Sequence, residues 1–191
     1  MLRDSVSLPH HVQAHSDAVT ELACHFCDLL ESHGYFFNKK LIRSGALLHD
    51  IARLQKHHTK TGGDLFLQLG YTEISQIISQ HHGLQKTLLN EAAIVFLSDK
   101  LIQETERVTI EKRFAESLCK CNSPEALKSH ERQLKQALDL QNMIQNLRLW
   151  FRQFGLFFQP TYGNRHLLAL ILRKQRWMQA QGRFLFEILV V

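Results

Sequence analysis

Apolar residues recur every three or four positions along almost the whole chain, which is the spacing that one face of an α-helix requires. The first such run extends from about residue 9 to residue 32. Similar runs predict helices over about 38–51, 59–69, 72–81, 90–104, from 109, over 123–155 and over 164–182. No run alternates apolar and polar residues convincingly, as a half-buried strand would. The pattern therefore predicts an all-α fold with short loops.

Residues that can cap a helix stand at the starts of several of these runs. An N-cap side chain accepts a hydrogen bond from the first helical turn, a role that Asn, Ser and Thr fill well. The candidates are Asn38, Thr72, Asn90, Thr109 and Ser123. Pro124 and Glu125 follow Ser123 and suit the first position and first turn of a helix, so a long helix should begin there.

The composition excludes several classes of protein. Of 191 residues, 45% are hydrophobic, nine are Gly and three are Pro, so the chain is neither low-complexity nor disordered as a whole. We expect one domain, with or without an appendage. No run reaches the ~18 apolar residues of a membrane span, and the first residues lack the apolar core of a signal peptide. We therefore expect a soluble, cytoplasmic protein whose four Cys are reduced.

The last part of the chain differs from the rest in charge. Residues 141–191 hold seven basic residues and one acidic residue, so the net charge of +5 comes from this segment. We therefore expect a helical domain over 1–155 and a basic, aromatic-rich helical extension over 156–191. Three roles are open for the extension, in order of preference: closing the fold, docking a protein partner or second copy, and binding nucleic acid or a membrane surface.

Four polar residues stand where the apolar pattern predicts buried side chains. They are His15, His49, His81 and Asp99, each in a different predicted helix, and Asp50 directly follows His49. Burying a lone imidazole or carboxylate is costly unless the group is paired. One such residue is usually a satisfied core group. Four from separate helices are hard to explain unless something positive lies between them.

A divalent cation would balance these side chains. Imidazoles and carboxylates form a mixed nitrogen and oxygen site, and the candidate ions are Fe, Mn, Co, Ni, Zn and Mg, one or two per chain. Such a site could lower the pKa of a bound water toward about 7 and supply hydroxide to an electrophile. A zinc site built from cysteines is an alternative, but two of the four lie inside the first helix without the turn that chelation needs. Those cysteines are Cys24, Cys27, Cys119 and Cys121.

These residues resemble the H…HD…D signature of the HD superfamily of metal-dependent phosphohydrolases. The signature positions are His15, the dipeptide His49-Asp50 in GALLHDIAR, and Asp99 in VFLSDK. The H-x-x-x-G element of the HDIG-type branch is similar to His58–Gly62, and its downstream histidines are similar to His81 and His82. Residues 99–114 also resemble HD modules associated with molybdopterin-type nucleotidyltransferases, and HD-type symmetrical dinucleoside tetraphosphatases share the plan. No GYP signature is present.

The resemblance covers about residues 9–140, so it implies that the domain over 1–155 is an HD helical bundle with additional C-terminal helices. It implies hydrolysis of a phosphate ester or anhydride, with a phosphorylated small molecule or nucleotide as substrate. Phosphomonoesterase, phosphodiesterase and dinucleoside polyphosphatase activities remain open. Two alternatives are a non-catalytic regulatory or binding module and a di-iron oxygenase.

The resemblance also implies roles for individual side chains. In HD enzymes generally, basic residues near the signature face the substrate phosphates, so Arg53 and Lys100 are expected to stabilise developing charge while Asp50 orients the activated water. The expected metal ligands are His15, His49, Asp50 and Asp99, with His58, His81 and His82 available for a second ion.

Overall fold

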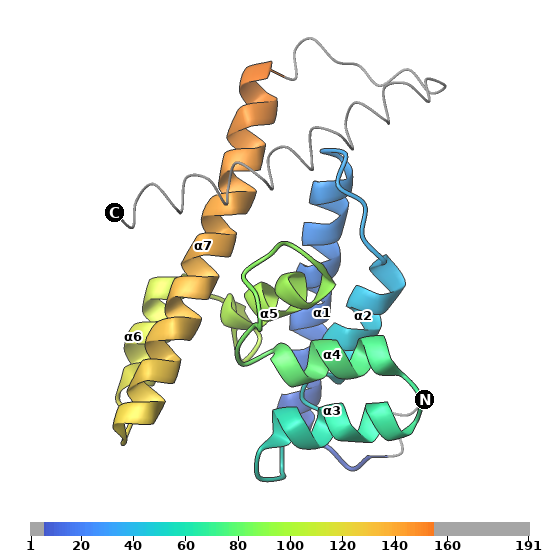
Figure 1. Cartoon of the computed structure of the whole chain (residues 1–191), viewed down its shortest axis with the longest axis vertical. Helices are drawn as coiled ribbons and strands as arrows, with labels where there is room; N and C mark the ends of the chain where they lie inside the picture. Colours follow the sequence, from blue (N-terminus) through green and yellow to red (C-terminus); the bar gives the residue numbers. More distant parts are fainter. Residues whose placement is uncertain (1–5, 155–191) are drawn as a thin grey trace. The chain divides into compact units, whose positions relative to one another are not determined.

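The computed structural model describes residues 6–154, and the side chains of residues 6–147. Its elements are α1 (His10–Glu31), α2 (Lys39–Leu48), α3 (His58–Gln68), α4 (Thr72–Gln80), α5 (Glu91–Lys100), β1 (Ile102–Gln103), β2 (Glu106–Arg107), α6 (Ile110–Leu118) and α7 (Pro124–Phe154). The all-α prediction is therefore confirmed (Figure 1). Among the described residues, no helix is long and apolar enough to cross a membrane. The predicted helix over 164–182 and the roles suggested for the extension lie outside the described residues.

Most of the predicted caps are present. Asn38 accepts a hydrogen bond from the Leu41 N–H at 3.1 Å, and Asn90 accepts one from Ala93 at 2.9 Å. Thr109 and Ser123 cap α6 and α7 in the same way. Thr72 is the exception, because it is the first helical residue of α4 and Tyr71 occupies the cap position.

Two predicted helices end earlier than expected. The chain leaves α2 at Leu48, so His49 and Asp50 lie just beyond its end, in the turns that lead to α3. The chain also leaves α5 at Lys100 and forms a small antiparallel hairpin, in which Ile102 pairs with Arg107. Two strands of two residues are too short to produce a visible alternation of apolar and polar positions, which explains why the sequence pattern did not indicate them.

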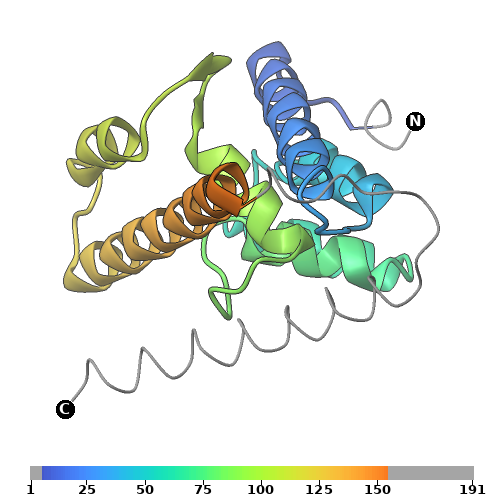
Figure 2. The same ribbon diagram turned by 90° about the horizontal axis from the view of Figure 1, so that it is seen from above.

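The helices pack around α5, whose described residues are almost all buried. The long α1 packs against α2 and α5, α2 also packs against α4, and α3 packs along α4. In both views α1 and α2 lie on one side of α5 and α6 lies on the other (Figures 1 and 2). Between α3 and α4 the approach is close: a Cβ atom added at Gly62 would lie 2.9 Å from Ile78 Cγ2. Glycine is therefore needed four residues after His58 to let this helix pair form.

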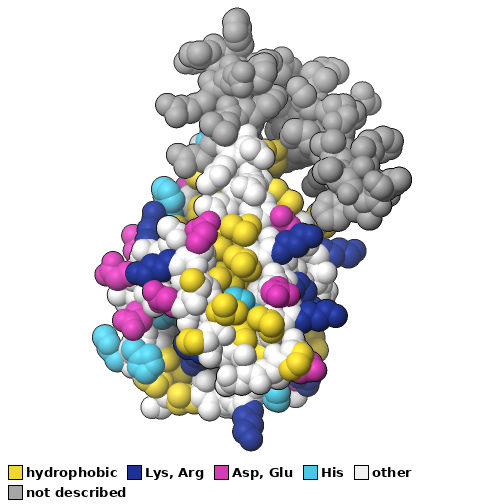
Figure 3. All heavy atoms as spheres, turned by 90° about the vertical axis from the view of Figure 1, so that its left-hand side faces the viewer, with side chains coloured by type: hydrophobic (Ala, Val, Ile, Leu, Met, Phe, Trp, Pro, Cys, Tyr) yellow, Lys and Arg dark blue, Asp and Glu magenta, His cyan; other side chains and the backbone are white. Residues whose placement is uncertain are grey.

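Two apolar clusters make up the core of the described residues. The larger one includes Val19, Ala46 and Ile77, and the smaller one includes Val12 and Ile78. The helices α6 and α7 extend the larger cluster with Phe114, Leu140 and Ile144. On the side of the molecule where α6 lies, a band of hydrophobic side chains is flanked by both acidic and basic ones (Figure 3). His15 falls between Val12 and Val19 on α1, so this polar residue lies where one cluster gives way to the other.

Candidate metal centre

Five helices bring the predicted ligands together, mostly at helix ends. His15 comes from the second turn of α1, and Asp99 comes from the last turn of α5. His49 caps the C-terminus of α2 and is followed by Asp50. His58 is the first residue of α3, and His81 caps the C-terminus of α4, with His82 next in the chain. Helix ends allow short side chains from different directions to meet at one place.

Backbone carbonyls fix the orientation of three imidazoles. The Nδ1 atom of His15 lies 2.9 Å from the Glu104 carbonyl, that of His49 lies 2.7 Å from the Ala46 carbonyl, and that of His81 lies 2.6 Å from the Ile78 carbonyl. Because a carbonyl only accepts, each Nδ1 must carry a proton and donate it. In a neutral ring the Nε2 atom then presents a lone pair, which is the form that ligates metals.

The Asp99 carboxylate has close neighbours at both of its oxygens. His15 Nε2 lies 3.1 Å from Asp99 Oδ1, and Lys100 Nζ donates to Asp99 Oδ2 at 2.6 Å. His49 Nε2 is a further 3.6 Å neighbour of Oδ1. We call His15, His49 and Asp99 the Asp99 group. Their ligand atoms all lie within 4.8 Å of one another.

The Asp50 carboxylate faces two sets of histidines. Its Oδ2 atom lies 3.8 Å from His49 Nε2, whereas its Oδ1 atom lies 3.3 Å from His58 Nε2 and 3.4 Å from His81 Nε2. A second group of ligand atoms within 4.8 Å of one another consists of His49, Asp50 and His81. Asp50 thus stands between the Asp99 group and the histidines of α3 and α4.

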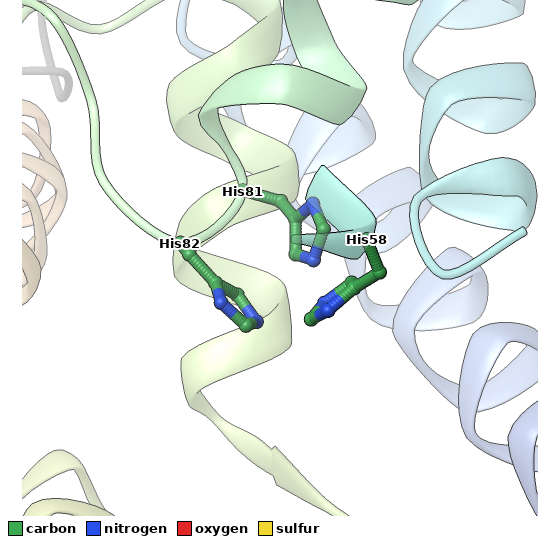
Figure 4. A group of neighbouring side chains, drawn as sticks. All are labelled: His58, His81 and His82. Carbon is green, nitrogen blue, oxygen red and sulfur yellow. The ribbon is translucent and has the colours of Figure 1, made fainter. Parts of the chain in front are cut away.

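The third group consists of His58, His81 and His82, which we call the three-histidine group. Their rings gather at one place, His58 from α3 and the other two from the end of α4 (Figure 4). The ring centroids of His81 and His82 are 4.4 Å apart, and those of His58 and His82 are 4.7 Å apart. Together with Asp50, the Asp99 group and the three-histidine group therefore form one continuous row of possible metal ligands.

Three buried atoms in this row have no hydrogen-bond partner among the described residues. They are His49 Nε2, Asp50 Oδ1 and His81 Nε2. Each is an acceptor when the rings are neutral, so the approaches of Nε2 atoms to carboxylate oxygens bring acceptor against acceptor. Unpartnered buried polar atoms are rare and costly. A cation among them would satisfy all three, so the residues present fit a divalent metal.

The electrostatics agree with a site built for positive charge. Burial would raise the pKa of Asp99, but Lys100 and the adjacent histidines outweigh it and hold that pKa well below its usual range. Burial likewise opposes ionisation of Asp50, but the nearby His58 and His81 outweigh it and lower its pKa strongly. Burial lowers the pKa of His81 to about 4, so that imidazole is neutral and able to ligate.

His49 and His82 respond differently to the same surroundings. Burial alone would lower the pKa of His49, but the nearby carboxylates, Asp99 first, outweigh it and raise the pKa. Desolvation, with a smaller contribution from Lys100, lowers the pKa of His82. A metal would therefore displace a proton more often from His49 than from His82.

The two basic residues expected to face substrate lie in different surroundings. The Arg53 side chain is 46% exposed, with Nη1 3.3 Å from His58 Nε2 and 3.6 Å from Asp50 Oδ1, so it borders the site. Lys100 is only 8% exposed, and its ammonium contacts Asp99 and the His81 carbonyl. Whether either group meets a phosphate stays a prediction.

Cysteines take no part in this centre. All four are free thiols, and among the described residues no cluster of ligand atoms close enough to hold a metal ion includes a cysteine. One contributor that sequence reasoning missed is the Glu104 carbonyl, which orients His15 from the turn of the β1–β2 hairpin. Glu104 has a φ of 54°, a left-handed conformation unfavourable for a residue other than glycine. A backbone acceptor leaves no signal in a sequence pattern.

Comparison with known proteins identifies the class to which this site belongs. Residues 12–103 match the HD domain family, and that range contains every proposed metal ligand. The chain belongs to the HD domain family, part of a superfamily of metal-dependent phosphohydrolases that bind divalent metals. An uncharacterized protein of Methanocaldococcus jannaschii is 31% identical over 133 residues, which cover 58% of this chain and 79% of that protein. No solved structure matches the chain at a significant level.

Proposed function

We propose that this protein hydrolyses a phosphate ester or anhydride of a nucleotide or similar small molecule, using a centre for two divalent cations. The observation that carries the proposal is the position of Asp50, whose Oδ2 faces His49 and whose Oδ1 faces His58 and His81. One carboxylate between two sets of imidazoles would be suited to binding two ions. HDIG-type membership and a nucleotide substrate are part of this proposal.

The two proposed positions use different side chains. The first ion would be held by His15, His49, Asp50 and Asp99, and the second by Asp50 together with the three-histidine group. The bound ions would supply Lewis-acid chemistry, polarising a phosphate oxygen and lowering the pKa of a water. The native metal is left to experiment, because imidazole and carboxylate together suit several divalent ions.

The chain's own residues would orient the reactants. Asp50 faces both ion positions, so its carboxylate is placed to hold the attacking water in line and to accept a hydrogen bond from it. Arg53 borders Asp50 and His58 and is half exposed, so its guanidinium can reach a phosphate that enters from solvent. Fixed positive charge near a transferring phosphoryl group stabilises its transition state. Lys100, buried against Asp99, would keep that carboxylate in place.

A non-catalytic module is the rival interpretation, and the state of the site argues against it. Loss of catalysis in a family removes the reason to keep costly buried groups, yet His49, Asp50 and His81 all remain with unpartnered atoms. A binding module would need neither the exposed Arg53 next to Asp50 nor a complete set of ligands.

The test is hydrolysis by protein stripped of metal and reloaded with Mn²⁺. Substrates should cover p-nitrophenyl phosphate, bis(p-nitrophenyl) phosphate, nucleoside monophosphates and a symmetrical dinucleoside tetraphosphate. We expect turnover of at least one class that requires the added metal and is lost in Asp50→Asn. The matched control is His25→Ala, which changes an exposed histidine of α1 outside the site. Failure of the loaded enzyme on every class, or equal turnover by the stripped enzyme, would overturn the proposal.

A further inference from the structure

One polar side chain of α7 is buried, although α7 follows the part of the chain that matches the HD family. Gln136 is 8% exposed, and it lies next to Ala137 and one turn before Leu140, which are fully buried in the larger core cluster. A buried amide is costly unless its donor and acceptor are both used. Its contacts therefore show what the residue does.

Both ends of the Gln136 amide bind the backbone of one residue. Its Oε1 atom accepts from the Leu84 N–H at 3.1 Å, and its Nε2 atom donates to the Leu84 carbonyl at 2.8 Å. This pair of bonds joins residues 52 positions apart. Both backbone polar groups of Leu84 are therefore held at once by the same side chain.

Leu84 ends a four-residue segment that begins with His81. At the start of the segment, the His81 carbonyl accepts from Lys100 Nζ at 3.2 Å. Inside it, the Gly83 N–H donates to the Gln80 carbonyl at 2.9 Å. A Cβ atom added at Gly83 would lie 3.4 Å from Arg132 Nη2, so α7 passes close to this point as well. The segment is thus held at both ends, by α5 and by α7.

His82 lies in the middle of this segment. Its ring meets His58 and His81 at centroid distances of 4.7 and 4.4 Å in edge-on contacts (Figure 4). Such contacts between small rings fix an orientation only weakly. The place of the His82 ring therefore depends on where the backbone of the segment is held.

We propose that Gln136 is a positioning residue, which holds the segment from His81 to Leu84 and so raises the affinity of the three-histidine group for a divalent cation. This inference rests on the proposed function, because it assumes the two-cation centre described there. Residues outside the ligand shell that orient ligands typically contribute 10–100-fold to metal affinity. Because Gln136 touches the segment and not the Asp99 group, its effect should fall on one of the two cation positions.

The experiment is calorimetric titration of metal-free, full-length protein with Mn²⁺, at a temperature well below unfolding. Gln136→Met keeps the size of the side chain and removes both hydrogen bonds. The control is Gln145→Met, the same change at an exposed position of α7. Gln136→Asn, which keeps the amide but shortens it, is the milder variant if Gln136→Met does not fold. Circular dichroism establishes folding in each case.

The expected result is two binding steps in the parent, of which Gln136→Met weakens one by about 10–100-fold and leaves the other unchanged. Gln145→Met should match the parent in both steps. Equal affinities in a folded Gln136→Met or Gln136→Asn protein would overturn the inference while leaving the two-cation centre intact. A uniform loss in both steps would also overturn it, since a general structural role predicts no selectivity.

A parent that binds one ion separates the two proposals. That stoichiometry would overturn the two-cation centre. The inference about Gln136 would then be supported if Gln136→Met weakened the single step by at least ~10-fold relative to Gln145→Met and His58→Ala abolished that step, which would place the ion in the three-histidine group. It would be overturned together with the centre if the single step did not change in Gln136→Met, or if that step survived His58→Ala.

Discussion

The two sides of the metal centre are built from the same kinds of side chain but differ in how well they are satisfied. On the Asp99 side, Lys100 donates to one carboxylate oxygen, and His15 Nε2 lies 3.1 Å from the other. On the Asp50 side, Asp50 Oδ1 and His81 Nε2 are buried without partners among the described residues, and so is His49 Nε2, which lies between the two carboxylates. Lys100 therefore balances the charge of Asp99 through a short, buried contact. Of the lysines and arginines whose side chains the structure describes, Asp50 has only the half-exposed guanidinium of Arg53, 3.6 Å from its Oδ1 atom, so the Asp50 side should depend more strongly on a bound cation.

The largest effect should follow from removing the charge of Asp50. Asp50→Asn keeps the shape of the side chain but leaves a neutral amide between the two cation positions. We expect metal-dependent hydrolysis to fall to background, with the circular dichroism spectrum unchanged and less metal retained after dialysis. Substantial metal-dependent activity in folded Asp50→Asn would contradict the special role given to the Asp50 side, because hydrolysis would then not need the charge of Asp50.

The next prediction separates the two sides by their metal content. His58→Ala should lose one ion of two and keep the ion of the Asp99 group, because His58 belongs to the three-histidine group. His15→Ala should lose the other ion, since His15 contacts Asp99 and belongs to the Asp99 group. Elemental analysis after loading with Mn²⁺ and dialysis gives the stoichiometry, with His25→Ala as the control. Loss of both ions in both variants would show that the sides are not independent.

Much of this site follows from the sequence, and the reason is physical. A histidine or aspartate within an apolar stripe is expensive to bury, so His15, His49, His81 and Asp99 stand out from the hydrophobic pattern alone. Asn38, Asn90 and Thr109 also indicate their helix starts correctly, because capping depends on neighbours three residues away.

Long-range backbone contacts could not be predicted in this way. The Glu104 carbonyl behind His15 and the Leu84 backbone held by Gln136 each depend on how distant segments meet. The β1–β2 hairpin was missed because its strands are too short to show a period. The packing of Lys100 between Asp99 and the His81 carbonyl also depends on how α4 and α5 meet, whereas its contact with a substrate phosphate stays a prediction.

A third prediction concerns stability. A ligand that binds only the folded state stabilises it by about 2.7 kcal/mol when its free concentration is 100 times the dissociation constant. For a chain of this size we therefore expect Mn²⁺ at that concentration to raise the melting temperature by about 5–10 °C. The shift should be smaller in His58→Ala and unchanged in His25→Ala. Differential scanning calorimetry at several Mn²⁺ concentrations measures it, and a melting temperature independent of Mn²⁺ would contradict the account.

The smallest predicted effect is a pH dependence on the Asp50 side. Burial lowers the pKa of His81 to about 4, against 6.5 for an ordinary histidine. As the pH falls from about 6.5 toward 4, the unfolded chain takes up a proton at this residue and the folded protein does not, so stability is lost. Between pH 7 and pH 5 the loss from this residue alone is about 2 kcal/mol.

Urea denaturation of the metal-free parent and of His81→Gln at pH 7 and pH 5 isolates this contribution. The raised pKa of His49 acts in the opposite direction in both proteins, so the comparison cancels most of it. We expect the parent to lose more stability than His81→Gln over this interval. Equal losses in the two proteins would mean that His81 is not held neutral by burial.

The central claim is that two cations flank Asp50, and a crystal structure of the Mn²⁺-loaded protein with anomalous diffraction data tests it most directly. The account predicts two anomalous peaks, one among His15, His49, Asp50 and Asp99, and one among Asp50, His58, His81 and His82. A single peak at the first position, with His58 and His81 free of metal in protein loaded to saturation, would contradict it.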